Sequence, residues 1–304
     1  MATTKSKKTT RSSKPKAATV KTHAKRVETV KAEVVEQEGK PFKGFFARKF
    51  DANETILTIF KSPRIYGAIV GEVIGTMLLT AILLTLGVYQ PLYIMFGVIA
   101  ISMAIFAFSG ANINPIVTVG MMASRRMSAI RGVVYLLSQV LGAWLAFLLV
   151  NAFRGASENA ADMPQMAAVA DGQFWLVTMI EFVGAIMIAF FFARALSYKR
   201  STFTFAAIYG GGVCVTLLFV IVISSTFSGL QNNFILNPAA ALMYQILPAG
   251  GENFGEIFGA ICGALLTYVI FPMVGGVLGF YLADFGARLS GEKTCCGDCN
   301  KIAK

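Results

Sequence analysis

The chain has few charged residues and almost no histidine. Only 14% of its 304 residues are Asp, Glu, Lys or Arg, against roughly a quarter in soluble domains, which argues against a freely soluble enzyme. The single histidine, His23, lies near the N-terminus, so a histidine-based catalytic or metal site is excluded from the rest of the chain. A secretory signal peptide needs an apolar stretch of about 7–15 residues, and we find none within residues 1–53.

The positive charge of the chain is concentrated at the N-terminus. Residues 1–50 contain 14 of the 27 Lys and Arg and 4 of the 16 Asp and Glu, while the other 254 residues contain 13 basic and 12 acidic ones. We therefore expect residues 1–53 to form a basic, disordered cytosolic tail, because dense positive charge resists translocation. Charge confined to a tail does not indicate a nucleic-acid partner. The segment 41–50 interleaves Phe with Lys and Arg, and it either rests on an anionic lipid surface or is simply solvated.

Long apolar runs predict an all-α membrane protein with six spanning helices. Hydrophobic residues make up 56% of the chain, and one spanning helix needs about 20 apolar residues. The predicted spans are about 67–87, 92–109, 131–152, 174–196, 203–225 and 257–283. The uncharged runs 73–124 and 201–251 are longer than the spans they contain. Their remaining parts are too short to cross a bilayer and too apolar for ordinary loops, so we expect one re-entrant segment in each.

The charges of the loops predict how the spans are oriented. The loops 123–131 and 194–200 contain basic residues and no acidic ones, whereas 153–172 and 248–256 are mainly acidic. By the positive-inside rule, the basic loops face the cytosol. Both termini are then cytosolic, including a second, cysteine-containing tail at 286–304, and we expect the protein in the cell membrane.

Each re-entrant segment contains an Asn-Pro pair. Asn114-Pro115 and Asn237-Pro238 both precede a short apolar stretch of helix-forming residues. Asn is a strong N-cap residue and Pro is favoured at the first helical position, so we predict short helices at about 115–123 and 238–246. Entering from opposite faces, they would bring two positive helix ends and two Asn side chains together near the membrane midplane.

The two halves of the chain look like an inverted repeat, with bounds of about 65–152 and 174–283. Glu72-Val-Ile-Gly-Thr in the first span corresponds to Glu181-Phe-Val-Gly-Ala in the fourth, although the loop charges orient these spans oppositely. An acidic residue inside a span is costly and normally has a partner. We therefore expect both glutamates to accept hydrogen bonds from the re-entrant loops and to anchor them. In the alternative interpretation, Glu72 reaches the membrane surface.

Over about residues 65–285, the chain resembles the aquaporin and aquaglyceroporin (major intrinsic protein) family. Ser109 to Gly120, SGANINPIVTVG, is similar to the first Asn-Pro-Ala loop of the family, SGAHxNPAVTxG, and Asn237-Pro238-Ala239 matches the second. The third and sixth helix patterns are present at Tyr135, Gln139, Gly142 and Ala143 and at Pro272, Gly275, Gly276, Gly279 and Tyr281.

The resemblance implies an aquaporin-like fold with six spanning helices and two re-entrant half-helices. It places the middle of a pore at Asn114, Pro115, Asn237, Pro238 and Ala239. It also implies a homotetramer with one pore per subunit that conducts water or small neutral solutes passively across the lipid bilayer. We expect no cofactor and no enzymatic activity, and no bound metal in the membrane-spanning part, because no nucleophile–base pair or metal-ligand set is present there.

The sequence departs from the family pattern at the outer selectivity filter. Ala240 stands where the family usually has Arg, and Ala241 where glycerol-conducting members have Asp; Asn112 and Ile116 replace His and Ala of the first loop. The resemblance places the filter at Phe96, Thr216, Phe234 and Ala240, with Ile94 and a neighbour of Thr216 as alternatives. Without the Arg the filter should be wider and more apolar, so glycerol joins water as a candidate solute. The missing Asp is not typical of a glycerol facilitator.

The sequence leaves other functions open. A gradient-coupled secondary transporter also uses inverted repeats and broken helices, but it generally needs ionisable groups in the membrane, and only Glu72 and Glu181 are available. A closed, structural member of the same fold would also fit the altered filter. Cys295, Cys296 and Cys299 are idle thiols, a metal or redox site, or palmitoylation sites.

Overall fold

The computed structural model describes residues 55–156, 173–198, 201–227, 234–243 and 253–291. All of them belong to one compact unit, Lys43–Lys304. The predicted N-terminal tail lies outside the described residues, and so do Cys295, Cys296, Cys299 and the end of the second predicted short helix.

Six helices of the described part are long and apolar enough to cross a membrane, with mean hydropathies of 2.1 to 2.4. They are α3 (Pro63–Leu86), α4 (Pro91–Ser109), α6 (Ala129–Gly155), α7 (Phe174–Ala195) followed by the 3₁₀ turn η2 (Leu196–Tyr198), α8 (Thr202–Ser225), and a last helix made of α10 (Phe254–Leu265), the π-helical turn η4 (Leu266–Ile270) and α11 (Phe271–Leu289). The predicted all-α fold with six spans is confirmed. A short helix, α2 (Ile56–Phe60), was not predicted and precedes α3.

Serine and glycine residues set several of the helix ends. The hydroxyls of Ser128 and Ser201 accept hydrogen bonds from backbone N–H groups three residues later, at 3.3 and 3.2 Å, and so cap α6 and α8. Gly87 and Gly110 follow α3 and α4 with φ angles of +63° and +86°. A side chain would be strained in that conformation, so these glycines allow the chain to turn directly into the next segment.

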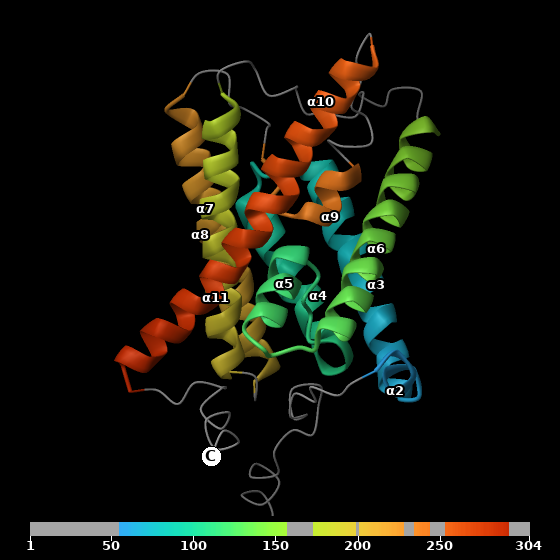
Figure 1. The fold of residues 1–304 in the computed structure, drawn as a ribbon, viewed down its shortest axis with the longest axis vertical. Helices are drawn as coiled ribbons and strands as arrows, with labels where there is room; N and C mark the ends of the chain where they lie inside the picture. Colours follow the sequence, from blue (N-terminus) through green and yellow to red (C-terminus); the bar gives the residue numbers. More distant parts are fainter. Residues whose placement is uncertain (1–54, 157–172, 199–200, 228–233, 244–252, 292–304) are drawn as a thin grey trace, which may run out of the picture. The chain divides into compact units, whose positions relative to one another are not determined.

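Two shorter helices, α5 (Pro115–Ala123) and α9 (Pro238–Ala241), lie between the long ones (Figure 1). Each begins at the proline of an Asn-Pro pair. Helix α5 has the predicted bounds, and α9 has the predicted start.

The two repeats are built around equivalent helix pairs. In the first repeat α3 packs on α6, in the second α7 packs on α11, and the equivalent helices α4 and α8 pack on each other and join the repeats. A Cβ added to Gly142 of α6 would lie 2.4 Å from the carbonyl oxygen of Val73, and one added to Gly279 of α11 would lie 2.3 Å from that of Ile186. Glycine therefore allows both helix pairs to approach closely, as is common in membranes.

Candidate functional site between the two short helices

Asparagine side chains cap both short helices. Asn114 Oδ1 accepts a hydrogen bond from the backbone N–H of Ile116 at 3.0 Å. Asn237 Oδ1 accepts hydrogen bonds from the backbone N–H groups of Ala239 at 3.1 Å and Ala240 at 3.4 Å. These bonds satisfy N–H groups that have no partner within a helix. The prediction that Asn-Pro pairs start both helices is confirmed.

Each asparagine also reaches across to the loop of the other repeat. Asn114 Nδ2 donates to the carbonyl oxygen of Leu236 at 2.9 Å, and Asn237 Nδ2 donates to that of Ile113 at 3.4 Å. Both side chains are buried. An amide nitrogen carries two N–H groups. One N–H of each asparagine therefore ties the two loops together, and its second N–H can donate to a solute.

The residue before each asparagine has an unusual backbone conformation. The φ angle is +45° at Ile113 and +54° at Leu236, which is the left-handed region that residues with side chains rarely adopt, least of all β-branched ones. Such a conformation costs of order 1–3 kcal/mol and persists only where the surroundings impose it. Its occurrence at equivalent positions shows that the two loops share this conformation directly before their asparagines.

Two buried glutamates provide hydrogen-bond acceptors for these loops. Glu72 accepts hydrogen bonds from the backbone N–H groups of the two residues before Asn114, at 3.1 and 2.8 Å. Glu181 accepts them from the two residues before Asn237, at 2.6 and 3.2 Å. These are the contacts that the anchor hypothesis requires. Because its side chain is buried, Glu72 does not reach the membrane surface.

Side chains of α6 brace the first loop further. Gln139 Nε2 donates to Glu72 Oε2 and to Thr118 Oγ1, both at 2.8 Å. The hydroxyl of Tyr135 donates to the carbonyl oxygen of Ser109 at 2.7 Å. Gln139 thus connects the glutamate of α3 to the short helix α5, which explains why the third-helix pattern contains a polar residue at this position.

A small cavity lies beside the two asparagines. Its volume is about 20 Å³ for the centres of water molecules, which is room for about one water. Asn114, Asn237 and Tyr209 provide the polar side chains of its lining. The apolar lining residues are Leu79, Leu83, Ile94, Val98, Ile188, Val213, Leu217, Ile235 and Leu236. A solute in this cavity therefore meets side-chain hydrogen-bonding groups at three positions, with apolar surface around them.

The predicted filter residue on α4 is wrong. Phe96 is 63% exposed and does not line the cavity, whereas the alternative, Ile94, is 1% exposed and does. Ile94 and Val98 are four residues apart and share one face of α4. Phe96 lies midway between them in the sequence and projects from the opposite side of the helix.

The other predicted filter positions are buried but lie outside the cavity lining. Thr216 donates its hydroxyl hydrogen to a carbonyl oxygen of its own helix at 2.8 Å, and its neighbours Val213 and Leu217 line the cavity instead. Phe234 and Ala240 are also buried without lining it. The four-residue spacing of the apolar residues Val213 and Leu217 is the sequence signal that could have identified this face of α8.

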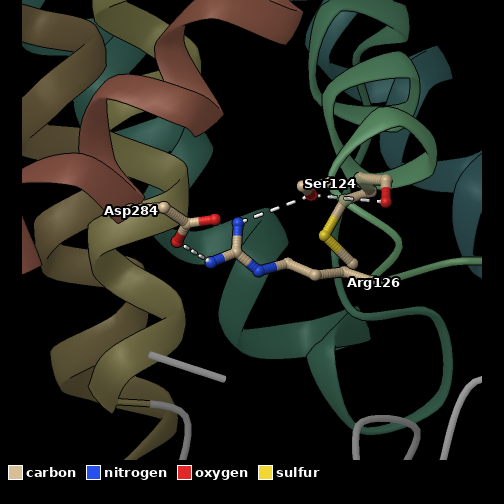
Figure 2. A network of polar contacts seen from close by, with 4 residues as sticks. Ser124, Arg126 and Asp284 are labelled. Carbon is tan, nitrogen blue, oxygen red and sulfur yellow. Dashed lines mark hydrogen bonds and ion pairs between the residues drawn. The ribbon is translucent and has the colours of Figure 1, made fainter. Parts of the chain in front are cut away.

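An ion pair lies beyond the C-terminal end of α5. Arg126 donates to Asp284 of α11 at 2.5 Å and to Ser124 Oγ at 3.5 Å (Figure 2). The guanidinium group also lies over the ring of Phe280, 5.2 Å from its centre. The side chains of the pair are only 9% and 12% exposed. Since the two residues are 158 positions apart, no sequence pattern predicted this link between the repeats.

The structure thus defines a class of membrane protein in which two inverted helical repeats bring two broken helices together at a buried cavity. Residues 59–282 match the family described as "Major intrinsic protein". The chain belongs to this family, and it is an integral membrane protein.

Similar proteins include both glycerol facilitators and aquaporins by name. "Glycerol uptake facilitator protein-like 6" of Lactiplantibacillus plantarum is 27% identical over 233 residues, which are 73% of this chain and 97% of the relative. "Aquaporin-1" of Sus scrofa is 24% identical over 178 residues, and "Aquaporin-4" of Rattus norvegicus is 25% identical over 176. The chain spans 59% and 51% of the lengths of these two mammalian proteins.

A solved structure supports the fold. The X-ray structure of the aquaglyceroporin from Plasmodium falciparum superposes with a TM-score of 0.53 at 20% sequence identity. The match covers 72% of this chain and 96% of that chain. At this identity the likeness establishes the aquaporin fold alone.

Proposed function

We infer that this protein is a passive membrane channel for water and for small uncharged solutes such as glycerol. The observation that carries this inference is the meeting of two asparagine amides, from opposite repeats, at one buried cavity. Membership of the major intrinsic protein family supports it, as does the similarity to a glycerol uptake facilitator-like protein and to aquaporins.

Solutes pass the middle of the channel by hydrogen bonding to the two asparagines. The oxygen of each amide is engaged by its own helix and one N–H by the opposite loop, so the second N–H donates to the oxygen of water or of an alcohol. The apolar side chains beside them offer no competing partners. The N-terminal ends of α5 and α9 carry partial positive charge, which opposes cations and hydrated protons.

We place the outer selectivity filter at Ile94, Leu217, Phe234 and Ala240. All four side chains are apolar and buried. Without a guanidinium group at position 240, this filter lacks a charged hydrogen-bond donor and favours solutes that carry some hydrocarbon. The variant Ala240→Arg should therefore lower glycerol permeability more than water permeability, and equal effects on both would contradict this assignment.

We also propose a homotetramer with one channel per subunit, in the cell membrane, with both termini in the cytosol. The loop charges support this orientation, and the family resemblance supports the tetramer. Large apolar side chains are exposed on the outer faces of the spans, among them Phe96, Trp144 and Trp175. In the assembly they would face lipid or a neighbouring subunit.

Gradient-coupled transport is less well supported than a passive channel. It would need an intramembrane group that exchanges an ion during transport. Glu72 and Glu181 are both buried and already accept hydrogen bonds from the re-entrant loops. If either glutamate gave up these hydrogen bonds to bind an ion, the loop that positions the asparagine would be disturbed.

Stopped-flow light scattering of proteoliposomes tests the proposed function. Vesicles with the wild-type protein should shrink in an osmotic gradient, and re-swell in glycerol, faster than empty vesicles and without saturation. Asn237→Asp should lose most of the excess flux, because a carboxylate replaces the amide donor at the cavity. Phe96→Leu, which changes an exposed side chain, should conduct like the wild type. Flux no faster than that of empty vesicles would refute the channel, and saturable, gradient-coupled flux would favour a carrier.

A further inference from the structure

Leu83 lines the cavity at a position where the two repeats differ. In both repeats the residue seven positions after the buried glutamate is apolar and lines the cavity, Leu79 on α3 and Ile188 on α7. Four positions later, Leu83 lines the cavity as well, whereas its counterpart Phe192 does not. Leu83 is thus a lining residue without an equivalent in the second repeat, and the family resemblance places no filter residue on its helix.

In the second repeat, Phe192 packs against a tyrosine instead. Phe192 is fully buried, and its ring centre lies 4.9 Å from that of Tyr209, with an angle of 90° between the ring planes. Tyr209 lines the cavity and carries a hydroxyl group. The wall of the cavity in front of Phe192 therefore includes a polar side chain, whereas Leu83 itself forms the wall with an apolar one.

The packing of α3 on α4 places Leu83 at the level of Ile94. The two helices are joined by the short turn 87–90, so they run in opposite directions. A Cβ added to Gly97 of α4 would lie 2.6 Å from Ile82 Cδ1 of α3, so these two residues face each other. Leu83 lies one residue closer to the turn on α3, and Ile94 three residues closer to it on α4. The two side chains are therefore within one helical turn of the same level.

The packing of α4 on α8 brings Val213 to this level too. A Cβ added to Gly210 of α8 would lie 3.0 Å from the backbone oxygen of the residue after Ile94. Toward the other end of α4, the ring centres of Phe106 and Phe205 are 4.3 Å apart. Since the residue numbers rise on α4 as they fall on α8, the two helices are antiparallel. Val213, less than one turn beyond Gly210, therefore lies close to the level of Ile94.

Leu83, Ile94 and Val213 thus form an apolar ring at one end of the cavity, with one residue from each of three helices. All three line the cavity, and none has a hydrogen-bonding group in its side chain. Tyr209 lies one turn before Val213 on α8, further from the 87–90 turn. A solute hydroxyl at the ring loses its water partners and finds no side chain to replace them, which is costly, whereas a methyl group gains from leaving water.

We propose that Leu83 is a specificity-determining residue of the channel, which with Ile94 and Val213 favours small neutral solutes that carry a hydrocarbon group over more hydroxylated ones. The hydroxyls of such a solute bind the amides of Asn114 and Asn237 while its hydrocarbon part contacts the apolar ring. This inference rests on the proposed channel function and extends it to the choice of solute.

Two solutes that differ by one hydroxyl group test the role of Leu83. Propane-1,2-diol and glycerol have the same three-carbon chain, and their permeabilities, in excess of those of empty vesicles, would be measured by light scattering of proteoliposomes. The wild type should conduct the diol faster than glycerol. Leu83→Asn, of similar volume, brings an amide into the apolar ring and should lower the ratio of diol to glycerol permeability about fivefold, the effect of one added hydrogen bond. Leu83→Thr, which brings a hydroxyl group, should lower the ratio in the same direction.

Two further variants separate specificity from a general disturbance of the channel. Leu83→Met keeps an apolar side chain of similar volume and should keep the wild-type ratio. Leu86→Asn makes the same polar change three residues further along α3, where the side chain is 41% exposed and does not line the cavity, and it should also keep the ratio. Wild-type ratios in both polar variants at position 83, or an equal fall in Leu83→Met or Leu86→Asn, would overturn the role of Leu83.

The wild-type protein separates this inference from the channel itself. Wild-type vesicles that conduct water but neither solute, or that conduct glycerol faster than the diol, would overturn the proposed specificity and leave the channel intact. Wild-type vesicles without any excess flux would overturn both.

Discussion

Replacement of Glu181 by glutamine tests whether a carboxylate holds the second re-entrant loop in its strained shape. Glu181 Oε1 accepts hydrogen bonds from the backbone N–H groups of Ile235 at 2.6 Å and Leu236 at 3.2 Å, and Leu236 has a φ angle of +54°. A hydrogen bond to a charged group contributes about 1.5–3 kcal/mol and a neutral one about 0.5–1.5 kcal/mol. Neutralising the acceptor of both bonds should therefore cost about 2–3 kcal/mol.

The stabilisation lost in Glu181→Gln is as large as the cost of the left-handed conformation of Leu236, which the two hydrogen bonds offset. A residue held in the left-handed region costs of order 1–3 kcal/mol, so without the charge Leu236 should relax toward ordinary angles. Its carbonyl oxygen, which accepts the hydrogen bond from Asn114 at 2.9 Å, would then move. We expect Glu181→Gln to lose stability and most of its water permeability together.

The assay combines chemical unfolding of the detergent-solubilised protein with water flux in proteoliposomes. Val183→Ala is the matched control, because Val183 lies two residues further along the same helix and is partly exposed. Val183→Ala should change neither the stability nor the water permeability appreciably. If Glu181→Gln unfolds and conducts like the wild type, the loop keeps its shape without the charge and the anchor hypothesis is refuted.

Two further substitutions test the packing and the ion pair by thermal unfolding in detergent. Gly142→Ala should destabilise the protein by about 1–3 kcal/mol, because the added Cβ would lie 2.4 Å from a backbone oxygen of α3. Its control is Gly211→Ala, which should not destabilise the protein, because no atom lies within 4 Å of the added Cβ. Asp284→Asn should lower the free energy of unfolding by about 3 kcal/mol, because it leaves the charge of Arg126 buried without its counter-ion. Its control is Arg125→Gln, which changes an exposed side chain and should leave the free energy of unfolding unchanged. Equal melting temperatures within either pair would contradict the corresponding argument.

The spans and the starts of the short helices could be predicted because their signals are local. A helix that crosses a membrane needs a continuous apolar run, and such runs are visible without any knowledge of tertiary contacts. Asn114-Pro115 and Asn237-Pro238 combine a capping side chain with a residue that fits only the first helical turn. The partners of Glu72 and Glu181 could be inferred because a buried carboxylate needs donors and the re-entrant loops have unpaired N–H groups.

Features that depend on distant contacts or on side-chain direction could not be predicted in this way. Arg126 and Asp284 are far apart in the chain, and neither lies in a pattern that marks an ion pair. The left-handed conformation of Ile113 contradicts its local preference and exists only because the loop is held by other elements. The error at Phe96 came from alignment to the family, in which a shift of two residues moves a side chain to the opposite side of the helix.

The two re-entrant loops share a left-handed residue before the asparagine, but they do not have the same side-chain contacts, and this difference predicts unequal dynamics. The glutamate of the first loop, Glu72, also accepts a hydrogen bond from Gln139, which ties it to α5. Within the described residues Glu181 accepts hydrogen bonds from backbone N–H groups and has no such glutamine. Opening of the second loop therefore breaks fewer side-chain contacts, and local opening controls amide exchange. Hydrogen–deuterium exchange should be faster in 234–241 than in 110–118, and Gln139→Leu should bring the first loop closer to the rate of the second. Equal protection of the two segments in the wild type would show that the glutamine adds nothing to the loop it contacts.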